Sequence, residues 1–148
     1  MLAELQKTEA EATPRQRIDR LQAEAAKLPQ LSLPTSHLFA DGMYCRVLPR
    51  PAGATIVGKV HKREHFYICA AGLVEVFSED GSRRTLGAGD VVVSKPGTKR
   101  TVFALVDSVC MTVHRTDSTD LDEIGRELTE TDETALFDAR NEPLKVLR

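Results

Sequence analysis

The spacing of apolar residues changes twice along the chain and divides it into three parts. Residues 1–37 contain a stripe with helical spacing, residues 38–115 contain short alternating runs typical of β-strands, and residues 116–148 return to helical spacing. We therefore expect a mainly β protein. Its parts are a helical and extended N-terminal arm, a single β-rich core and a helical C-terminal tail.

The N-terminal arm is predicted to contain one amphipathic helix. Thr13, Pro14 and Gln16 match a capping box with proline at the first helical position, where its missing N–H costs nothing. Pro29 ends the helical pattern, and residues 30–37 follow as an extended segment. The expected buried face of the helix consists of Ile18, Leu21, Ala25 and Leu28.

The core is predicted to consist of eight short strands with no helix between them. Asp80-Gly81 separates two of them and is typical of a tight hairpin, because glycine accepts a positive φ. Many short strands of this kind indicate a sandwich or a barrel. The expected strands are Met43–Leu48, Thr55–Val60, His65–Ala70, Leu73–Phe77, Arg84–Leu86, Val91–Ser94, Thr101–Val106 and Val109–His114.

One of these strands is apolar on both faces. Phe66 and Ile68 lie on one side of it, and Tyr67 and Cys69 lie on the other. We therefore expect its outer face to be covered, either by the N-terminal arm or by another subunit, and the second possibility favours a homo-oligomer.

The tail is predicted to begin with a helix that Asp120 or Thr119 caps. A second short amphipathic helix is expected over residues 133–139. The apolar face of the first helix consists of Leu121, Ile124 and Leu128.

Charge is distributed unevenly between the three parts. The chain has 22 acidic and 20 basic side chains, a net charge of −2, which excludes a protein held to nucleic acid by charge alone. The arm is neutral, the core carries 11 basic and 7 acidic side chains, and the tail carries 4 basic and 10 acidic ones. The acidic tail is expected to lie on the core, on a neighbouring copy, on a basic partner or in solvent.

Composition excludes several further classes. No run of 18 apolar residues is present, so we expect no membrane partner. With 2 Tyr, 5 Phe and no Trp, stacking platforms for nucleic acid are not expected. Cys45, Cys69 and Cys110 lack paired spacing and are interpreted as buried thiols in a reducing compartment rather than a disulfide frame.

The densest group of chemically competent side chains lies in residues 58–67. Gly72, Gly89-Asp90 and Pro96-Gly97 follow it with the spacing of two glycine-rich motifs. On these residues, the region 42–114 resembles the cupin superfamily. The resemblance implies a double-stranded β-helix, or jelly roll, with a site inside the barrel.

Two of the four ligand positions implied by this resemblance hold cations. A lysine or arginine repels a divalent ion, so these two side chains are expected to bind a carboxylate or phosphate instead. Alternatively, Arg100 pairs with Glu64 or Glu75 as a structural contact. The four positions are Lys59, His61, His65 and Arg100.

His114 is a candidate for a third metal ligand. It ends the last expected strand, on the same alternating face as Thr112. If this face is the barrel interior, His61, His65 and His114 form a three-histidine site. The alternative is that hydrogen bonds to backbone or carboxylate groups satisfy these rings. His37 lies in the arm and is interpreted as structural.

A narrower resemblance covers residues 28–128. The runs KPGTKR at 95–100 and VHRT at 113–116 are similar to those of small cupin-like proteins encoded by tailed bacteriophages. This resemblance implies a phage origin and a jelly roll, but no reaction.

From these patterns we predict a non-catalytic virion structural or assembly protein of decoration or cement type. It is expected to bind copies of itself and other virion proteins through its arms, in the host cytoplasm during assembly and then in the virion, with no cofactor, membrane or specific nucleic acid. Two alternatives stay open. One is a metal-dependent cupin enzyme that uses His61, His65 and His114 around a divalent transition metal, and the other is a metal-free module in which Lys59 and Arg100 bind an anion.

Overall fold

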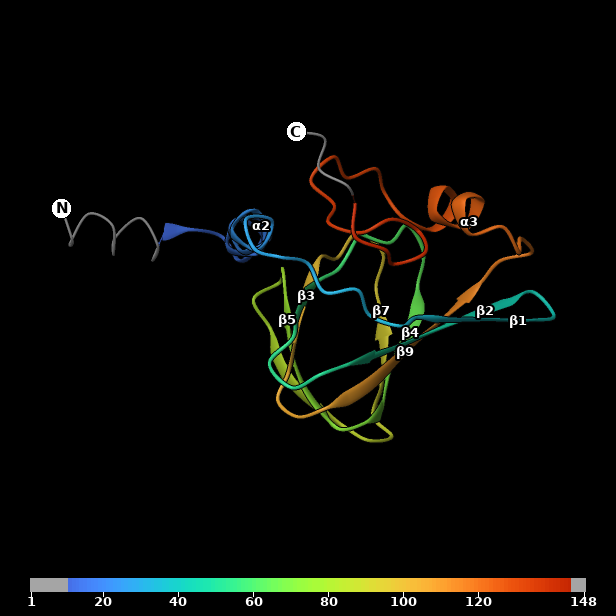
Figure 1. The fold of residues 1–148 in the computed structure, drawn as a ribbon, viewed down its shortest axis with the longest axis horizontal. Helices are drawn as coiled ribbons and strands as arrows, with labels where there is room; N and C mark the ends of the chain where they lie inside the picture. Colours follow the sequence, from blue (N-terminus) through green and yellow to red (C-terminus); the bar gives the residue numbers. More distant parts are fainter. Residues whose placement is uncertain (1–10, 145–148) are drawn as a thin grey trace.

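Two antiparallel sheets face each other in the computed structural model, which describes residues 11–144 (Figure 1). One sheet has the strand order β1-β2-β9-β4-β7 and the other the order β3-β8-β5-β6. This arrangement confirms the predicted jelly roll. The strands are β1 (Ser36–Ala40), β2 (Met43–Arg50), β3 (Thr55–Val57), β4 (His65–Ala71), β5 (Leu73–Ser78), β6 (Arg83–Gly87), β7 (Val91–Ser94), β8 (Arg100–Ala104) and β9 (Ser108–Arg115).

All eight expected strands are present, and their ends differ from the prediction by at most three residues. The ninth, β1, begins in the segment 30–37 that was predicted to be extended, and continues through residues 38–40, for which no strand was predicted. It pairs with β2 along its whole length, so that Ser36 is opposite Val47 and Ala40 is opposite Met43. Because the edge of β2 offers backbone groups that need partners, an adjoining extended segment becomes an additional strand.

The turn between β5 and β6 confirms the predicted hairpin, since Gly81 has a φ of +86°. A second glycine, Gly72, joins β4 to β5 with a φ of +87°. A β-carbon at Gly72 would collide with the Ser108 hydroxyl and lie 2.5 Å from the Asp107 carbonyl oxygen. Only glycine therefore allows these chain segments to approach so closely.

The core between the sheets fills one end of the barrel. Cys69, Val74 and Cys110 are fully buried there, and Cys69 is opposite Cys110 in the β4–β9 register. All three cysteines are free thiols, as expected, although Cys45 is only half-buried.

The helix α2 (Pro14–Ala25) has the predicted cap. The Gln16 backbone N–H donates to Thr13 Oγ1 at 3.1 Å, and the Thr13 N–H donates to Gln16 Oε1 at 2.9 Å. This reciprocal pair satisfies two backbone N–H groups at the start of the helix.

The predicted buried face of α2 is wrong in part. Ile18 is buried, but Leu21 and Leu28 are exposed, and the second buried residue of the helix is Gln22. The Gln22 side-chain amide donates to the Thr134 carbonyl oxygen at 2.7 Å. The helix is therefore oriented by a polar contact with the tail rather than by its leucines.

The tail begins with α3 (Leu121–Leu128), capped by Asp120 as expected. Ile124 and Leu128 are buried against Tyr44 of the barrel.

The second expected helix, over residues 133–139, is absent from the described chain, and turns stand in its place. The Asp132 carboxylate accepts from the Thr134 N–H at 2.9 Å, and the Asp138 carboxylate accepts from the Arg140 N–H at 2.9 Å. Such local side-chain bonds compete with helical ones. The apolar residues Leu136 and Phe137 line the barrel cavity instead of one helix face.

The acidic tail lies on the chain's own barrel, across the open end that the core does not fill (Figure 1). The Lys62 N–H donates to the Leu128 carbonyl at 2.8 Å, and the Glu130 N–H donates to the Val60 carbonyl at 2.9 Å. Arg63 adds a salt bridge to Glu127 at 3.1 Å. Four positions were expected for this tail, and the structure shows the first of them, in which the tail lies on the core.

The outer face of the five-stranded sheet is open to solvent. Phe66 of β4 is 49% exposed, so the described part of the N-terminal arm does not cover this face, contrary to one of the two expectations. No helix among residues 11–144 is both long and apolar enough to cross a membrane.

Candidate metal centre

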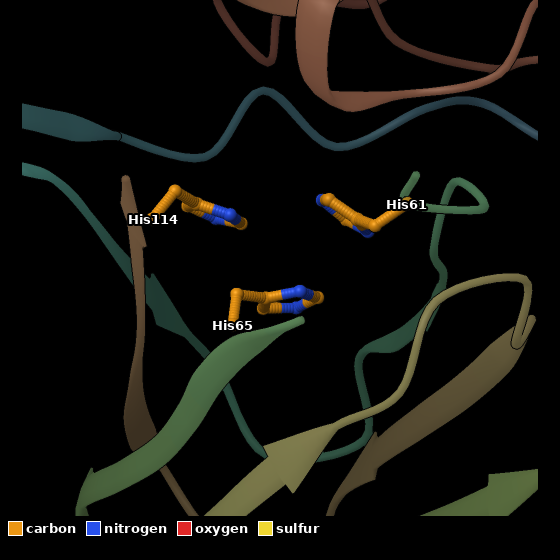
Figure 2. Close-up of side chains that lie close together, drawn as sticks. All are labelled: His61, His65 and His114. Carbon is orange, nitrogen blue, oxygen red and sulfur yellow. The ribbon is translucent and has the colours of Figure 1, made fainter. Parts of the chain in front are cut away.

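Three histidines from different segments meet inside the open end of the barrel (Figure 2). His61 lies in the loop after β3, His65 begins β4, and His114 lies near the end of β9. Their ring centroids are separated by 4.3 Å, 5.2 Å and 4.5 Å for the pairs 61–65, 61–114 and 65–114. One nitrogen from each ring lies within 4.8 Å of the other two. The structure thus brings together the three residues named as metal candidates.

Strand register explains two of the three positions. Phe66 is opposite Val113 in the β4–β9 pair, and their neighbours His65 and His114 come next on the opposite face of the sheet. This is the barrel face, where His65 and His114 are 5% and 6% exposed.

The third histidine is positioned by backbone contacts from two other segments. His61 forms an isolated β-bridge with Thr129 of the tail, and its carbonyl accepts from the Gly97 N–H at 2.9 Å. The tail therefore fixes the loop that carries this ring.

Burial keeps all three imidazoles neutral. Burial is the main cause that lowers the pKa of His61 to about 2, of His65 to about 4 and of His114 to about 3, and the neighbouring rings and Arg100 contribute to the value for His61. Neutral imidazole is the form that binds a metal, so no ligand proton has to be displaced at neutral pH.

A backbone contact also determines which ring nitrogen of His65 carries the proton. Its Nδ1 lies 3.3 Å from the Arg63 carbonyl oxygen, and because a carbonyl only accepts, this nitrogen carries the proton. The lone pair on Nε2 is then free for a ligand bond. Metal-binding histidines are held by the same kind of contact to a backbone carbonyl.

The ligand set fits a first-row transition metal. Nitrogens that bind one zinc ion at about 2.0–2.1 Å lie at most about 4.2 Å apart, so small side-chain rotations would bring these three into range. Three protein ligands leave at least one position free for water or a substrate, which is the arrangement of catalytic rather than structural zinc sites.

The two cations predicted at ligand positions both line the cavity. Arg100 donates to the Ser94 hydroxyl, and its guanidinium carbon lies 5.4 Å from the centre of the Tyr67 ring. The alternative pairing of Arg100 with Glu64 or Glu75 is wrong. Glu64 pairs with Lys95, and Glu75 pairs with Arg83.

His37 has a structural role, as interpreted from the sequence. Its Nδ1 lies 2.5 Å from the Tyr44 hydroxyl, and the two rings stack with centroids 5.8 Å apart. Tyr44 in turn stacks on His114 at 5.8 Å. His37 thus supports the metal candidates through Tyr44 and is not one of them.

Sequence reasoning missed three polar residues of the cavity wall, Arg46 and Arg50 of β2 and Tyr67 of β4. The signal was present: positions 44, 46, 48 and 50 share one face of β2, and that face is the barrel interior. Arginines at alternate positions of an inward face were not recognised as cavity residues because arginine is usually found at the surface.

The cavity has a volume of about 160 Å³ and is closed on one side by α3 and the following turns. A water molecule takes up about 30 Å³ in the liquid. The cavity therefore has room for about five waters or one small organic molecule beside the histidines.

Comparison with known proteins identifies the fold through solved structures. No protein-family model and no curated protein matches the sequence. KdgF from a Halomonas species matches 60% of this chain and 84% of its own, with 18% identity and a TM-score of 0.52. An uncharacterized conserved Klebsiella pneumoniae protein with a double-stranded β-helix domain matches 67% of this chain and 90% of its own, with 17% identity and a TM-score of 0.52.

A third structure, the cupin domain of Cnp3 from Schizosaccharomyces pombe, matches 65% of this chain and 73% of its own, with 19% identity and a TM-score of 0.50. The chain has the cupin fold. At these identities the likeness establishes the fold alone. In this cupin fold, His61 and His65 point into the barrel as the motif resemblance implied, and a histidine of β9 supplies the third ring.

Proposed function

We propose that this cupin binds one divalent transition metal ion through His61, His65 and His114 and acts on a small molecule in the adjoining cavity. The observation that supports the proposal is the convergence of three neutral imidazoles within 4.8 Å. A bound ion would act as a Lewis acid or activate a bound water molecule.

The chain's own residues suit this role. Tyr44 and the Arg63 carbonyl hold His114 and His65, and the bridge to Thr129 holds His61. The tail covers one side of the cavity and reduces its contact with bulk solvent, which strengthens electrostatic interactions inside.

A non-catalytic role in a phage virion, as a decoration or assembly protein, is the second candidate. The open apolar face of the five-stranded sheet favours it, since such a face suits a protein contact. It ranks second because α2 and the described part of the tail both contact the chain's own core, through Lys99 and through the backbone of residues 60–62. Phage origin, virion partners and passage from host cytoplasm to virion belong to this candidate.

The experiment that tests the metal proposal is titration of chelator-treated full-length protein with Zn²⁺, Mn²⁺, Fe²⁺, Co²⁺ and Ni²⁺ by calorimetry, combined with elemental analysis of the purified chain. We expect one ion per chain, and the His114→Ala variant should bind at least about 100-fold more weakly. Leu28→Ala, at an exposed leucine outside the barrel, is the control and should keep its metal. Equal binding by the two variants, or no binding by the native chain, would contradict the proposal.

A further inference from the structure

The inward residues next to the histidines form a second row across the same sheet. Thr112 of β9 is opposite Arg46 of β2 on one side and Tyr67 of β4 on the other. This row lies two residues deeper in the barrel than His114, a step of about 6.6 Å along a strand. Arg50 lies further down β2 on the same face.

Several polar atoms of these residues are buried without a partner. They are Arg46 Nε, Arg50 Nε and Nη1, and the Tyr67 hydroxyl, none of which has a hydrogen bond within residues 11–144. Arg50 is only 5% exposed. A buried donor without an acceptor is costly, and an arginine cannot lose its charge to avoid that cost.

Within the described chain, no carboxylate forms a salt bridge with Arg46, Arg50 or Arg100. The acids of the cavity wall, Asp132 and Asp138, are engaged within the tail or by Gln22 and Lys99. The cavity wall therefore presents guanidinium groups and a phenol hydroxyl whose buried donors contact no carboxylate of residues 11–144.

We infer that the cavity binds a small organic carboxylate, with Arg46, Arg50 and Tyr67 as its anion site. In this inference the carboxylate pairs with the arginines and Tyr67, and another oxygen-bearing group of the same molecule faces the histidines. The inference deepens the proposed function, and its statement about the histidines rests on that function. The planar guanidinium matches the two oxygens of a carboxylate. The cavity volume limits the ligand to a short acid.

This anion site differs from the one suggested by the sequence, which consisted of Lys59 and Arg100. Arg100 already donates to Ser94 and stacks on Tyr67, so it helps to position that phenol. Arg46 and Arg50 retain the free donors.

The test measures thermal stability and calorimetric binding of full-length protein with malonate, succinate and inorganic phosphate, at constant ionic strength set with chloride. We expect the dicarboxylates to raise the Tm by a few degrees in a saturable manner. Arg46→Met and Arg50→Met should bind them at least about tenfold more weakly, and Arg84→Met, which replaces an exposed arginine of β6, should bind normally.

The Tm of the ligand-free variants is a second readout. It distinguishes arginines that bind a ligand from arginines that stabilise the fold. Replacing an unpaired buried arginine by methionine should leave the Tm of the ligand-free chain unchanged or higher, because no partner is lost. A large fall in Tm for both variants, together with no binding of malonate or succinate to the native chain, would overturn the inference. Binding of phosphate alone would overturn the carboxylate assignment.

The two proposals fail in different ways. His114→Ala should lose the metal but retain malonate binding, and Arg46→Met should retain the metal but lose malonate binding. If no metal binds but malonate binding depends on Arg46, the proposed metal function fails and the anion site stands. If the metal binds but none of the carboxylates does, the anion site fails alone.

Discussion

Three imidazole rings can be buried together only if none of them is charged. Each has a pKa of about 2–4 in the folded chain and about 6.5 when unfolded, so the unfolded state binds more protons between these values. Folding stability therefore decreases as the pH falls below about 6.5.

We predict that the metal-free protein loses up to about 1.4 kcal/mol of unfolding free energy per pH unit for each buried histidine between pH 6 and 4.5. Urea denaturation at a series of pH values would measure this slope. His61→Gln should reduce the slope by about a third, and His37→Gln should reduce it less. A slope that His61→Gln leaves unchanged would contradict this account.

A single glycine determines how closely two loops approach at the other end of the barrel. We predict that Gly72→Ala destabilises the fold by about 3 kcal/mol or more, because the new methyl group meets Ser108 in addition to straining a positive φ. Gly89→Ala is the control, since Gly89 has a φ of +91° but nothing within 4 Å of its β-carbon position, and should cost about 1 kcal/mol. Equal losses in chemical denaturation would argue against the steric contact.

At the scale of elements, Lys99 connects three parts of the chain. It is 3% exposed and pairs with Asp19 of α2 at 2.9 Å and with Asp132 of the tail at 3.8 Å. Burial alone would raise the pKa of Asp19, but the hydrogen bond and charge of Lys99 hold it below its usual value.

We predict that Lys99→Met lowers the free energy of unfolding by about 1–2 kcal/mol, since Asp19 is half exposed and is partly solvated once unpaired. Hydrogen exchange should increase in α2 and in the tail together. Lys27→Met, at an exposed lysine, serves as the control. Faster exchange confined to one of the two elements would contradict the connecting role.

The elements also show which features the sequence alone could predict. The cap of α2 depends on three adjacent residues, and its prediction is confirmed. The buried face of α2 depends on Thr134, which is distant in sequence, so the spacing of leucines could not reveal it. The same holds for residues 133–139, whose apolar side chains are directed by the cavity rather than by a helical period.

For the whole molecule, the resemblance to cupins implied the jelly roll, while alternation along strands predicted a sandwich or a barrel and placed His114 on the face of Thr112. It could not show whether that face was interior, because β9 is flanked on both sides by strands whose register the sequence leaves open. The inward arginines of β2 were missed because arginine is usually found at the surface, so their shared face was not recognised as the interior one.

The apolar outer face gives the predicted self-association a location. One row of paired residues, with one residue from each strand, crosses this face and has no charged side chain. Two copies of such a surface can pack against each other about a two-fold axis. The row is Leu38, Cys45, Val113, Phe66 and Val93.

We predict a homodimer in light scattering after size exclusion, which Phe66→Lys converts to a monomer without loss of fold. Leu28→Lys, at an exposed leucine outside the sheet, should remain dimeric. A native chain that is monomeric at high concentration would contradict the prediction.

The bridge between His61 and Thr129 makes the complete set of three rings depend on the tail. His65 and His114 are held by strands of one sheet, whereas the loop that carries His61 also needs the segment around Thr129 to be docked on the barrel. A variant whose tail is undocked would keep two imidazoles in register and lose the third, so metal affinity would report on the docking of the tail.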